Sequence, residues 1–392
     1  MRSWVRVAAG LFAIGYGANQ FSPLMVAYRE QEHFSAVMVA AFFGVYAAGL
    51  APGLLLGGPA SDRWGRRRLM LPALAVSAPA SAVLALGALP SLSEPALYVG
   101  RFLFGVVTGV AMVVGTSWVK ELSQPPHDAA DPGAGARRAA LALSAGFGIG
   151  PLVGGLLARF GPFPLEMPYV AHIVITVVVL AVAVGAPDTG TDLAPVLRVR
   201  VHLPRRFLRV VLPMAPWVFG AVAISFAVQP AALGAGGGSL LFATLLAALT
   251  QTTGVCIQSW ARRLDSRSPV LAARVGLGAV LAGTVVAAAA AALGSPVLAV
   301  PASLVLGAGY GLCLVAGLLE VQRMAEPEHL AGLTAVFYSL TYVGFLLPVL
   351  LAALTGLVGY PVLLAGLAVL VALSFAVVVR NGRSAPVLES VG

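Results

Sequence analysis

The chain has 392 residues, of which 59% are hydrophobic and only 10% are charged, and its formal net charge is +9. Soluble domains carry about 25% charged residues, so this composition excludes an ordinary soluble fold and indicates a chain that crosses a membrane repeatedly. The basic residues form short clusters between apolar stretches. This pattern favours contact with membrane lipid and excludes nucleic acid as a partner.

Twelve apolar segments are each long enough to cross a bilayer, which takes about 20 residues in a helix. The first begins after Arg2 and Arg6, as a signal peptide does, but it is too long and lacks a small-residue cleavage site, so we expect it to be retained. The predicted spans cover residues 4–28, 36–57, 69–90, 96–118, 138–159, 166–186, 209–231, 238–260, 269–293, 296–319, 330–354 and 358–380. The predicted fold class is all-α and integral to the membrane.

The basic residues predict the orientation of these spans. Of the 24 Lys and Arg residues, all but Arg29, Arg101 and Arg159 fall in connections on one side if the N-terminus lies inside. This bias matches the positive-inside rule, with both termini cytoplasmic. We expect a multi-pass protein of the bacterial inner membrane.

The chain divides into two similar halves. A Pro- and Arg-rich linker at 188–208 separates an N-terminal six-helix bundle at 1–187 from a C-terminal bundle at 209–392. Glycines recur with the same spacing in the fourth and tenth spans, at Gly105, Gly109 and Gly115 and at Gly307, Gly311 and Gly317. Equal helix counts and repeated spacing predict a duplication.

The most specific motif follows the second span. It reads G-x-x-x-D-R-x-G-x-R-R and comprises Gly58, Asp62, Arg63, Gly65, Arg67 and Arg68. A cluster that only fixes orientation would explain the arginines but not Gly58, Asp62 and Gly65. The segment resembles the signature loop of the major facilitator superfamily, which implies two pseudo-symmetric six-helix bundles. It also implies that Asp62 caps the eleventh helix and latches the halves together on the cytoplasmic side.

A second motif lies in the fifth span and comprises Gly146, Gly150, Pro151, Gly154 and Gly155. It resembles the G-x-x-x-G-P-x-x-G-G motif of exporters in that superfamily, including drug–proton antiporters. The proline bends a helix, and glycines at i, i+4 and i+8 allow close helix packing. A generic glycine packing face is the alternative.

Charged residues near the membrane suggest coupling and gating. Arg101 in the fourth span precedes two glycines and resembles the superfamily's helix-four motif, which implies a role in coupling or substrate binding; snorkelling towards the membrane surface is the alternative. Glu121 and Glu320 end the fourth and tenth spans, where they can form gating ion pairs with the arginine loops. The first span lacks the acid that related antiporters often carry, which leaves the coupling mechanism open.

Other polar residues within the spans are candidates for a substrate cavity, with hydrogen bonding between helices as the alternative for each. They are Tyr16, Asn19, Gln20, Trp217, Gln229, Gln251, Tyr310, Tyr338 and Tyr342.

The sequence therefore predicts a secondary transporter that exports a small amphipathic molecule, such as a drug, natural product or modified sugar, coupled to protons. We expect a functional monomer without cofactor or metal, and no enzymatic activity, because no Walker loop or catalytic cluster occurs. An importer or uncoupled facilitator is the alternative, and a membrane enzyme or scaffold is a remote one.

Overall fold

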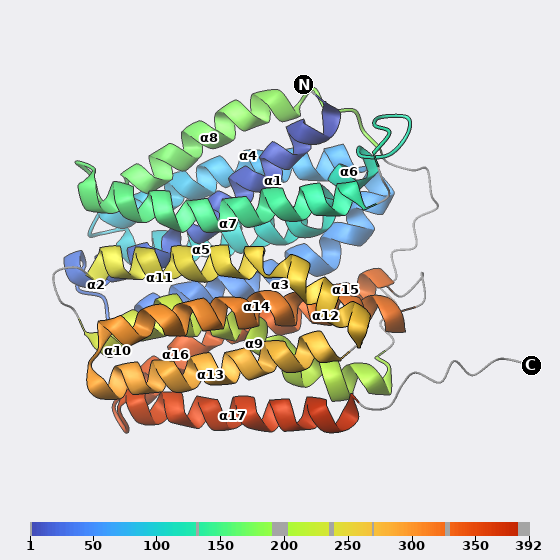
Figure 1. The fold of residues 1–392 in the computed structure, drawn as a ribbon. Coiled ribbons are helices and arrows are strands. Elements are labelled where there is room, and N and C mark those ends of the chain that lie inside the picture. The colour runs from blue at the N-terminus through green and yellow to red at the C-terminus, as the bar shows by residue number, and fades with distance from the viewer. Residues whose placement is uncertain are drawn as a thin grey trace, which may run out of the picture.

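The computed structural model describes residues 2–130, 133–189, 203–234, 239–268, 270–325 and 330–382. Within these ranges the secondary structure is helical throughout, with no strand, which confirms the predicted all-α class. The helices run roughly parallel along one axis (Figure 1). Both described ends of the chain lie at the same end of the molecule as the arginine clusters, which we call the arginine-rich end.

The first bundle contains helices that correspond to the first six predicted spans. Their bounds are α1 Ser3–Asn19, α2 Phe21–Gln31, α3 Ala36–Trp64, α4 Arg66–Ala85, η1 Leu86–Ala88, α5 Ser93–Val110, η2 Ala111–Gly115, α6 Thr116–Glu121, α7 Ala134–Phe160 and α8 Met167–Ala183.

The second bundle repeats this organisation with the remaining six spans. Its elements are η3 Phe207–Val211, α9 Leu212–Ala223, η4 Ile224–Val228, α10 Gln229–Leu233, α11 Ser239–Cys256, α12 Gln258–Arg267, α13 Leu271–Leu293, α14 Pro296–Met324, α15 Leu330–Tyr342, η5 Val343–Leu346, α16 Leu347–Leu354 and α17 Tyr360–Asn381.

In the described residues, 9 helices are long and apolar enough to cross a membrane, and 10 if the pair α11 and α12, bent by 41°, is one span. Helix α8 is apolar but shorter. The chain is therefore a multi-pass membrane protein.

Several predicted spans are interrupted where the sequence analysis expects continuous helices, and prolines explain four of the breaks. Proline lacks the N–H that would bond the carbonyl four residues earlier. Helix α1 ends at Asn19, four residues before Pro23. The other three breaks each contain the residue four positions before a proline. They are the π segment η3 before Pro213, the π segment η4 before Pro230 and the 3-10 segment η5 before Pro348.

The repeated glycines allow close helix packing in both bundles. A Cβ on Gly109 would lie 2.5 Å from the carbonyl oxygen of Leu50, so α5 packs backbone to backbone on α3. A Cβ on Gly307 would lie 2.6 Å from the carbonyl oxygen of Thr250, so α14 packs equally closely on α11. Corresponding spans thus pair in corresponding ways, as a pseudo-symmetric fold requires.

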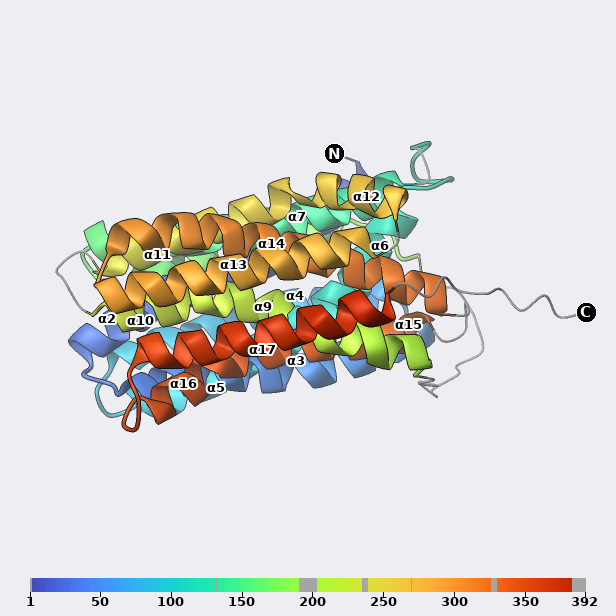
Figure 2. The same ribbon diagram turned by 60° about the horizontal axis from the view of Figure 1, so that its bottom comes forward.

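The two bundles meet along α7 with α11 and along α3 with α15 and α16. Figures 1 and 2 show α7 and α11 side by side in both views. The largest cluster of buried apolar side chains extends across both bundles, and a smaller one lies within the first bundle around Leu11, Met70 and Trp118.

Candidate functional site

The signature loop forms a tight turn between α3 and α4. Gly65 alone separates the two helices, and its φ of 91° is one that side-chain-bearing residues rarely adopt. Arg66 follows and binds Glu121 at 3.0 Å between Nη2 and Oε1, while its Nη1 contacts Asp62. Arg66 therefore joins α3, α4 and α6 at the arginine-rich end.

The segment after α8 docks on this turn. The backbone N–H of Arg67 donates to Oδ1 of Asp188 at 3.2 Å, and the Arg67 guanidinium donates to the Val184 carbonyl at 2.8 Å. Nε1 of Trp118 donates to the Pro187 carbonyl at 3.0 Å. The start of the linker is thus bound to the N-terminal bundle; residues 190–202 of the predicted linker lie outside the described residues.

The predicted latch residue, Asp62, has 58% of its side chain exposed and pairs within its own bundle. Its expected partner is the start of the eleventh helix. The residues directly before that helix, 326–329, lie outside the described residues. The latch therefore stays a prediction. Gly58 lies against Val113, and Arg63 stacks on the neighbouring ring of Trp64 at 5.4 Å.

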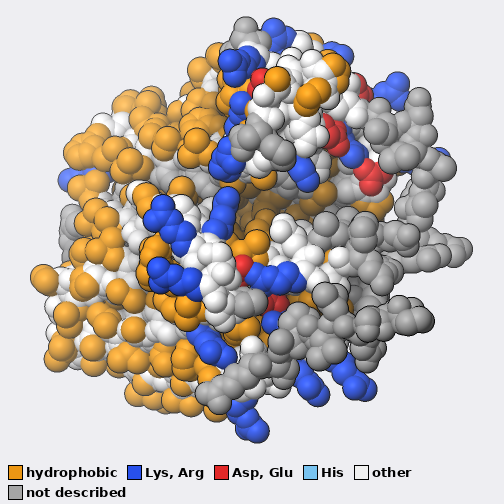
Figure 3. All heavy atoms as spheres, turned by 45° about the vertical axis from the view of Figure 1, so that its right-hand side comes forward, with side chains coloured by type: hydrophobic (Ala, Val, Ile, Leu, Met, Phe, Trp, Pro, Cys, Tyr) orange, Lys and Arg blue, Asp and Glu red, His pale blue; other side chains and the backbone are white. Residues whose placement is uncertain are grey.

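The second bundle has its own charge network at the same end. Glu320, fully buried, accepts from Nε of Arg206 at 2.9 Å and from Nη1 of Arg323 at 2.9 Å. Arg323 also contacts Asp265. Glu121 and Glu320 thus both pair with arginines, as the sequence suggests, and each pair described here stays within one bundle. Figure 3 shows Lys and Arg side chains gathered at this end, on a surface hollowed between the bundles.

The helix-five motif packs on two different neighbours. Gly146 and Gly150 lie against the backbone of α1, and a Cβ on Gly154 would lie 3.0 Å from the Gln20 carbonyl oxygen. Gly155 faces the other bundle, where its Cβ would lie 2.8 Å from Cβ of Thr244 on α11. The α-helix continues through Pro151 to Phe160. One helix therefore contacts its own bundle and the partner bundle through glycine.

Arg101 is completely enclosed, so it does not snorkel to the surface. Its Nη1 donates to the Ala18 carbonyl at 3.0 Å and its Nε to the Phe42 carbonyl at 3.3 Å. The guanidinium carbon lies 4.4 Å from the ring centroid of Tyr46 and 4.5 Å from that of Phe21, within cation–π range. Among the described residues, Nη2 has no hydrogen-bond partner.

Aromatic side chains from both bundles meet beside Arg101. The ring centroids of Phe43 and Phe345 are 4.8 Å apart, and those of Phe219 and Tyr342 are 4.3 Å apart. The ring of Tyr46 lies 6.2 Å from that of Tyr342. We call these five residues the aromatic layer. It lies between the bundles and joins α3, α9 and α15–η5.

The remaining cavity candidates divide between this region and the interiors of the bundles. Tyr310 contacts Phe219 of the aromatic layer, and the hydroxyl of Tyr342 donates to Sδ of Met112 at 3.3 Å. Trp217 instead donates to Oγ of Ser374 at 2.9 Å, between α9 and α17.

The predicted amides are buried. Asn19 donates to the Phe147 carbonyl at 3.3 Å, and Gln229 donates to Ser303 at 3.1 Å. Both polar atoms of the Gln20 side chain and Oε1 of Gln251 lack partners among the described residues. Buried polar atoms are normally satisfied, so these amides are candidates to bind a solute. Tyr338 is half-buried on α15, and Tyr16 stacks on His172 with ring centroids 6.1 Å apart.

The sequence analysis missed Phe43, Tyr46, Phe219 and Phe345. Phe43 and Tyr46 stand at i and i+3 on α3, and Tyr342 and Phe345 repeat that spacing on the later helix. This repeated spacing of aromatic residues is the sequence feature that could have indicated the aromatic layer. In the part of the chain that the structure describes, no three His, Cys, Asp or Glu residues are grouped to hold a metal.

Comparisons with known proteins agree with this architecture. The sequence profile of the Major Facilitator Superfamily matches residues 7–347. No curated protein sequence matches. Solved structures with similar folds include a nucleoside transporter, NupG, with TM-score 0.74 and 12% identity, covering 97% of this chain and 100% of that one.

Two further solved structures are similar over nearly their full length. One is a D-xylose–proton symporter, with TM-score 0.73 and 14% identity, covering 95% of this chain and 96% of that one. The other is a POT family transporter in complex with 5-aminolevulinic acid, with TM-score 0.77 and 11% identity, covering 97% and 96%. At these identities the likeness establishes the shared fold.

Proposed function

The chain belongs to the major facilitator superfamily of membrane transporters, and we propose that it exports a small amphipathic molecule by proton-coupled alternating access. The observation that carries the proposal is the helix-five motif. Its glycines place α7 in backbone contact with α1 and, through Gly155 and Thr244, in close contact with α11 of the other bundle. In alternating access the two bundles rock about a central site, so such a seam must move.

The cargo site in this proposal lies at the aromatic layer. Rings from both bundles offer apolar faces, and Tyr46, Tyr310 and Tyr342 add phenol groups. Such a lining suits an amphipathic molecule with a flat apolar body. The guanidinium of Arg101 lies 4.4 Å from the ring centroid of Tyr46 and supplies positive charge to the same region.

The arginine-rich end faces the cytoplasm in this proposal, as the positive-inside rule requires. The ion pairs of Arg66 and Glu320 each stay within one bundle. We propose that Asp62, which is exposed, engages the eleventh helix in the outward-open state and holds that end closed.

Flux in vesicles of known orientation tests the proposal. Everted vesicles with an acidic interior should accumulate an amphipathic probe such as phenylpropionate, and dissipating the gradient should abolish accumulation. Xylose and uridine serve as polar comparison probes. Accumulation that ignores the gradient would exclude antiport, and gradient-driven movement only in the opposite direction would exclude export.

A matched pair of variants tests the role of the motif. Gly155→Ala places a methyl group 2.8 Å from Cβ of Thr244, closer than packed atoms tolerate, whereas Gly148→Ala meets Gln251 at an ordinary 3.9 Å. We expect Gly155→Ala to lose most flux and Gly148→Ala to retain it. Equal flux in the two variants would mean that the close contact at Gly155 is not required for transport, and the proposal would lose its support.

An importer is the second candidate, because one solved structure with the same fold is described as a sugar–proton symporter. The direction of flux in the same vesicles separates the two candidates.

A further inference from the structure

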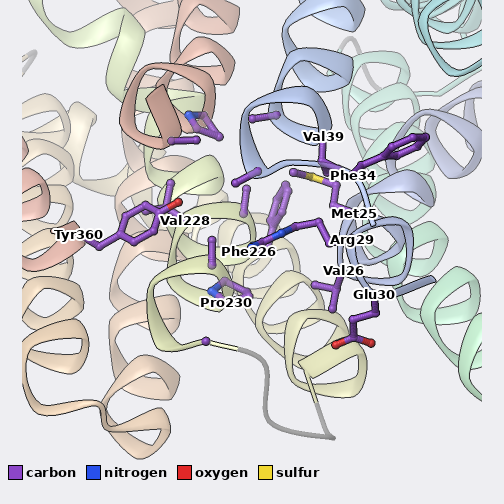
Figure 4. A pocket seen from close by; sticks show the side chains of 17 residues that line it. Met25, Val26, Arg29, Glu30, Phe34, Val39, Phe226, Val228, Pro230 and Tyr360 are labelled. Carbon is purple, nitrogen blue, oxygen red and sulfur yellow. The ribbon is translucent and has the colours of Figure 1, made fainter. Parts of the chain in front are cut away.

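A cavity of about 200 Å³ lies between the bundles at the end opposite the arginine-rich end. Its walls come from α2, the start of α3, the η4–α10 region, α16 and the start of α17 (Figure 4). Most of the lining is apolar, including Met25, Phe34 and Phe226. An apolar cavity of about 150 Å³ can hold benzene, so this one has room for a ring-sized apolar body.

One arginine points into this cavity. Figure 4 shows the Arg29 side chain extending between the bundles towards Phe226 and Pro230, whereas the carboxylate of the adjacent Glu30 is turned away. None of the ion pairs within the described residues involves Arg29. The lining therefore contains one cation, Arg29, that points into the cavity, and one carboxylate, Glu30, that points away from it.

Two helix ends add to the positive potential. Helix α3 begins at Ala36 and helix α17 begins at Tyr360, and both residues line the cavity. The N-terminus of a helix carries a partial positive charge and favours anions. Arg29 also lies on the side where the positive-inside rule disfavours arginine, so membrane orientation does not explain it.

We propose that this cavity binds an amphipathic organic acid, with the apolar body among Met25, Phe34 and Phe226 and the anionic group at Arg29. The inference rests on the proposed function in one respect: it takes this acid to be the transported molecule, bound at the place where it is released. Binding itself requires neither a gradient nor a direction of transport.

Cysteine protection tests the site in the full chain. Ala231 lines the cavity and is half-buried, so Ala231→Cys provides a reporter in a Cys256→Ala background, since Cys256 is exposed and Cys313 is buried. The protein is reconstituted in phosphatidylcholine vesicles without a gradient. Membrane-impermeant methanethiosulfonates, one anionic and one cationic, then report the modification rate with and without phenylpropionate or phenylpropylammonium.

We expect phenylpropionate to slow modification and the matched ammonium compound to have no effect. Arg29→Gln should abolish this protection and lower the ratio of anionic to cationic modification rates about tenfold, because the local positive potential is lost. Arg29→Lys should preserve both effects. Arg159→Gln is the control, because Arg159 is the other arginine predicted on this side and does not line the cavity.

Equal protection by both compounds, or protection that survives Arg29→Gln, would overturn the inference, as would protection that requires anionic phosphatidylglycerol in the vesicles. Retained melting temperature in Arg29→Gln shows that a loss is not unfolding. Protection without gradient-driven flux would contradict only the proposed function, and flux without protection would contradict only this site.

Discussion

The charge networks at the arginine-rich end differ in polarity between the two bundles. In the first, one arginine, Arg66, lies between two carboxylates, Asp62 and Glu121. In the second, one carboxylate, Glu320, lies between two arginines, Arg206 and Arg323. Glu121 and Glu320 occupy corresponding helix ends, so both bundles have a charge network at the same position. Its central residue is an arginine in the first bundle and a glutamate in the second.

Burial also differs between these carboxylates of the two networks. The Glu320 side chain is 0% exposed, whereas Glu121 is 33% exposed and Asp62 is 58% exposed. Water can therefore solvate the acids of the first network when their partner is removed, but it reaches Glu320 poorly. The comparison implies that the second network is the more rigid and the first the more easily rearranged.

The largest expected effect is that of Glu320→Ala. The substitution leaves Arg206 and Arg323 next to each other without their shared acid, and we expect a destabilisation of about 2 to 3 kcal/mol. Thermal unfolding in detergent measures it.

Glu121→Ala is the matched control, because it removes the corresponding, more exposed acid. A destabilisation by Glu121→Ala equal to that by Glu320→Ala would contradict the assigned difference in burial.

Arg66→Ala should have a smaller effect, about 1 kcal/mol, because the two acids that it leaves behind can be solvated. Added salt should narrow the difference from wild type, since partly exposed pairs are screened. The same thermal measurement at low and high salt checks this. A larger loss than that of Glu320→Ala would reverse the comparison.

The sequence predicts one side of this comparison better than the other. The signature loop contains Gly65, whose φ of 91° forms the turn, and the sequence predicts arginines that can pair with Glu121. In the second bundle a basic segment also precedes the third span, with Arg262, Arg263, Asp265 and Arg267, but of these residues only Asp265 joins the network described here. Arg206 comes from a different part of the chain, and sequence spacing does not show which helix ends meet.

The central region shows the same limit. The sequence left both enclosure and snorkelling open for Arg101, because its aromatic neighbours come from α2 and α3, far away in sequence. Each of the prolines at 23, 213, 230 and 348 removes one backbone donor next to a break, but Pro52, Pro59 and Pro151 lie inside continuous α-helices, so the sequence does not show which proline interrupts a helix. Apolar periodicity alone predicts uninterrupted spans, because it carries no information on backbone hydrogen bonds.

Asp62→Asn should separate gating from stability. Its pair with Arg66 is an exposed i,i+4 pair, worth about 0.3–0.5 kcal/mol, so the melting temperature should hardly change. We expect flux to fall if Asp62 latches the bundles. Transport assays beside melting curves check this, with Asp128→Asn, which removes the acid of an ion pair outside both networks, as the control. Unchanged flux in Asp62→Asn would leave the residue with a local structural role only.

The smallest effect concerns an ion pair outside both networks. Oδ2 of Asp128 accepts from Nη1 of Arg138 at 2.7 Å, and this hydrogen bond holds the pKa of Asp128 below its usual value of 3.8. A carboxyl whose pKa is lowered by folding stabilises the protein above its unfolded pKa, and that contribution is lost as the pH falls through the folded pKa. The difference in melting temperature between wild type and Asp128→Asn should therefore be small at neutral pH and vanish on acidification. A difference that grows with acidity would mean that the pair does not stabilise the fold.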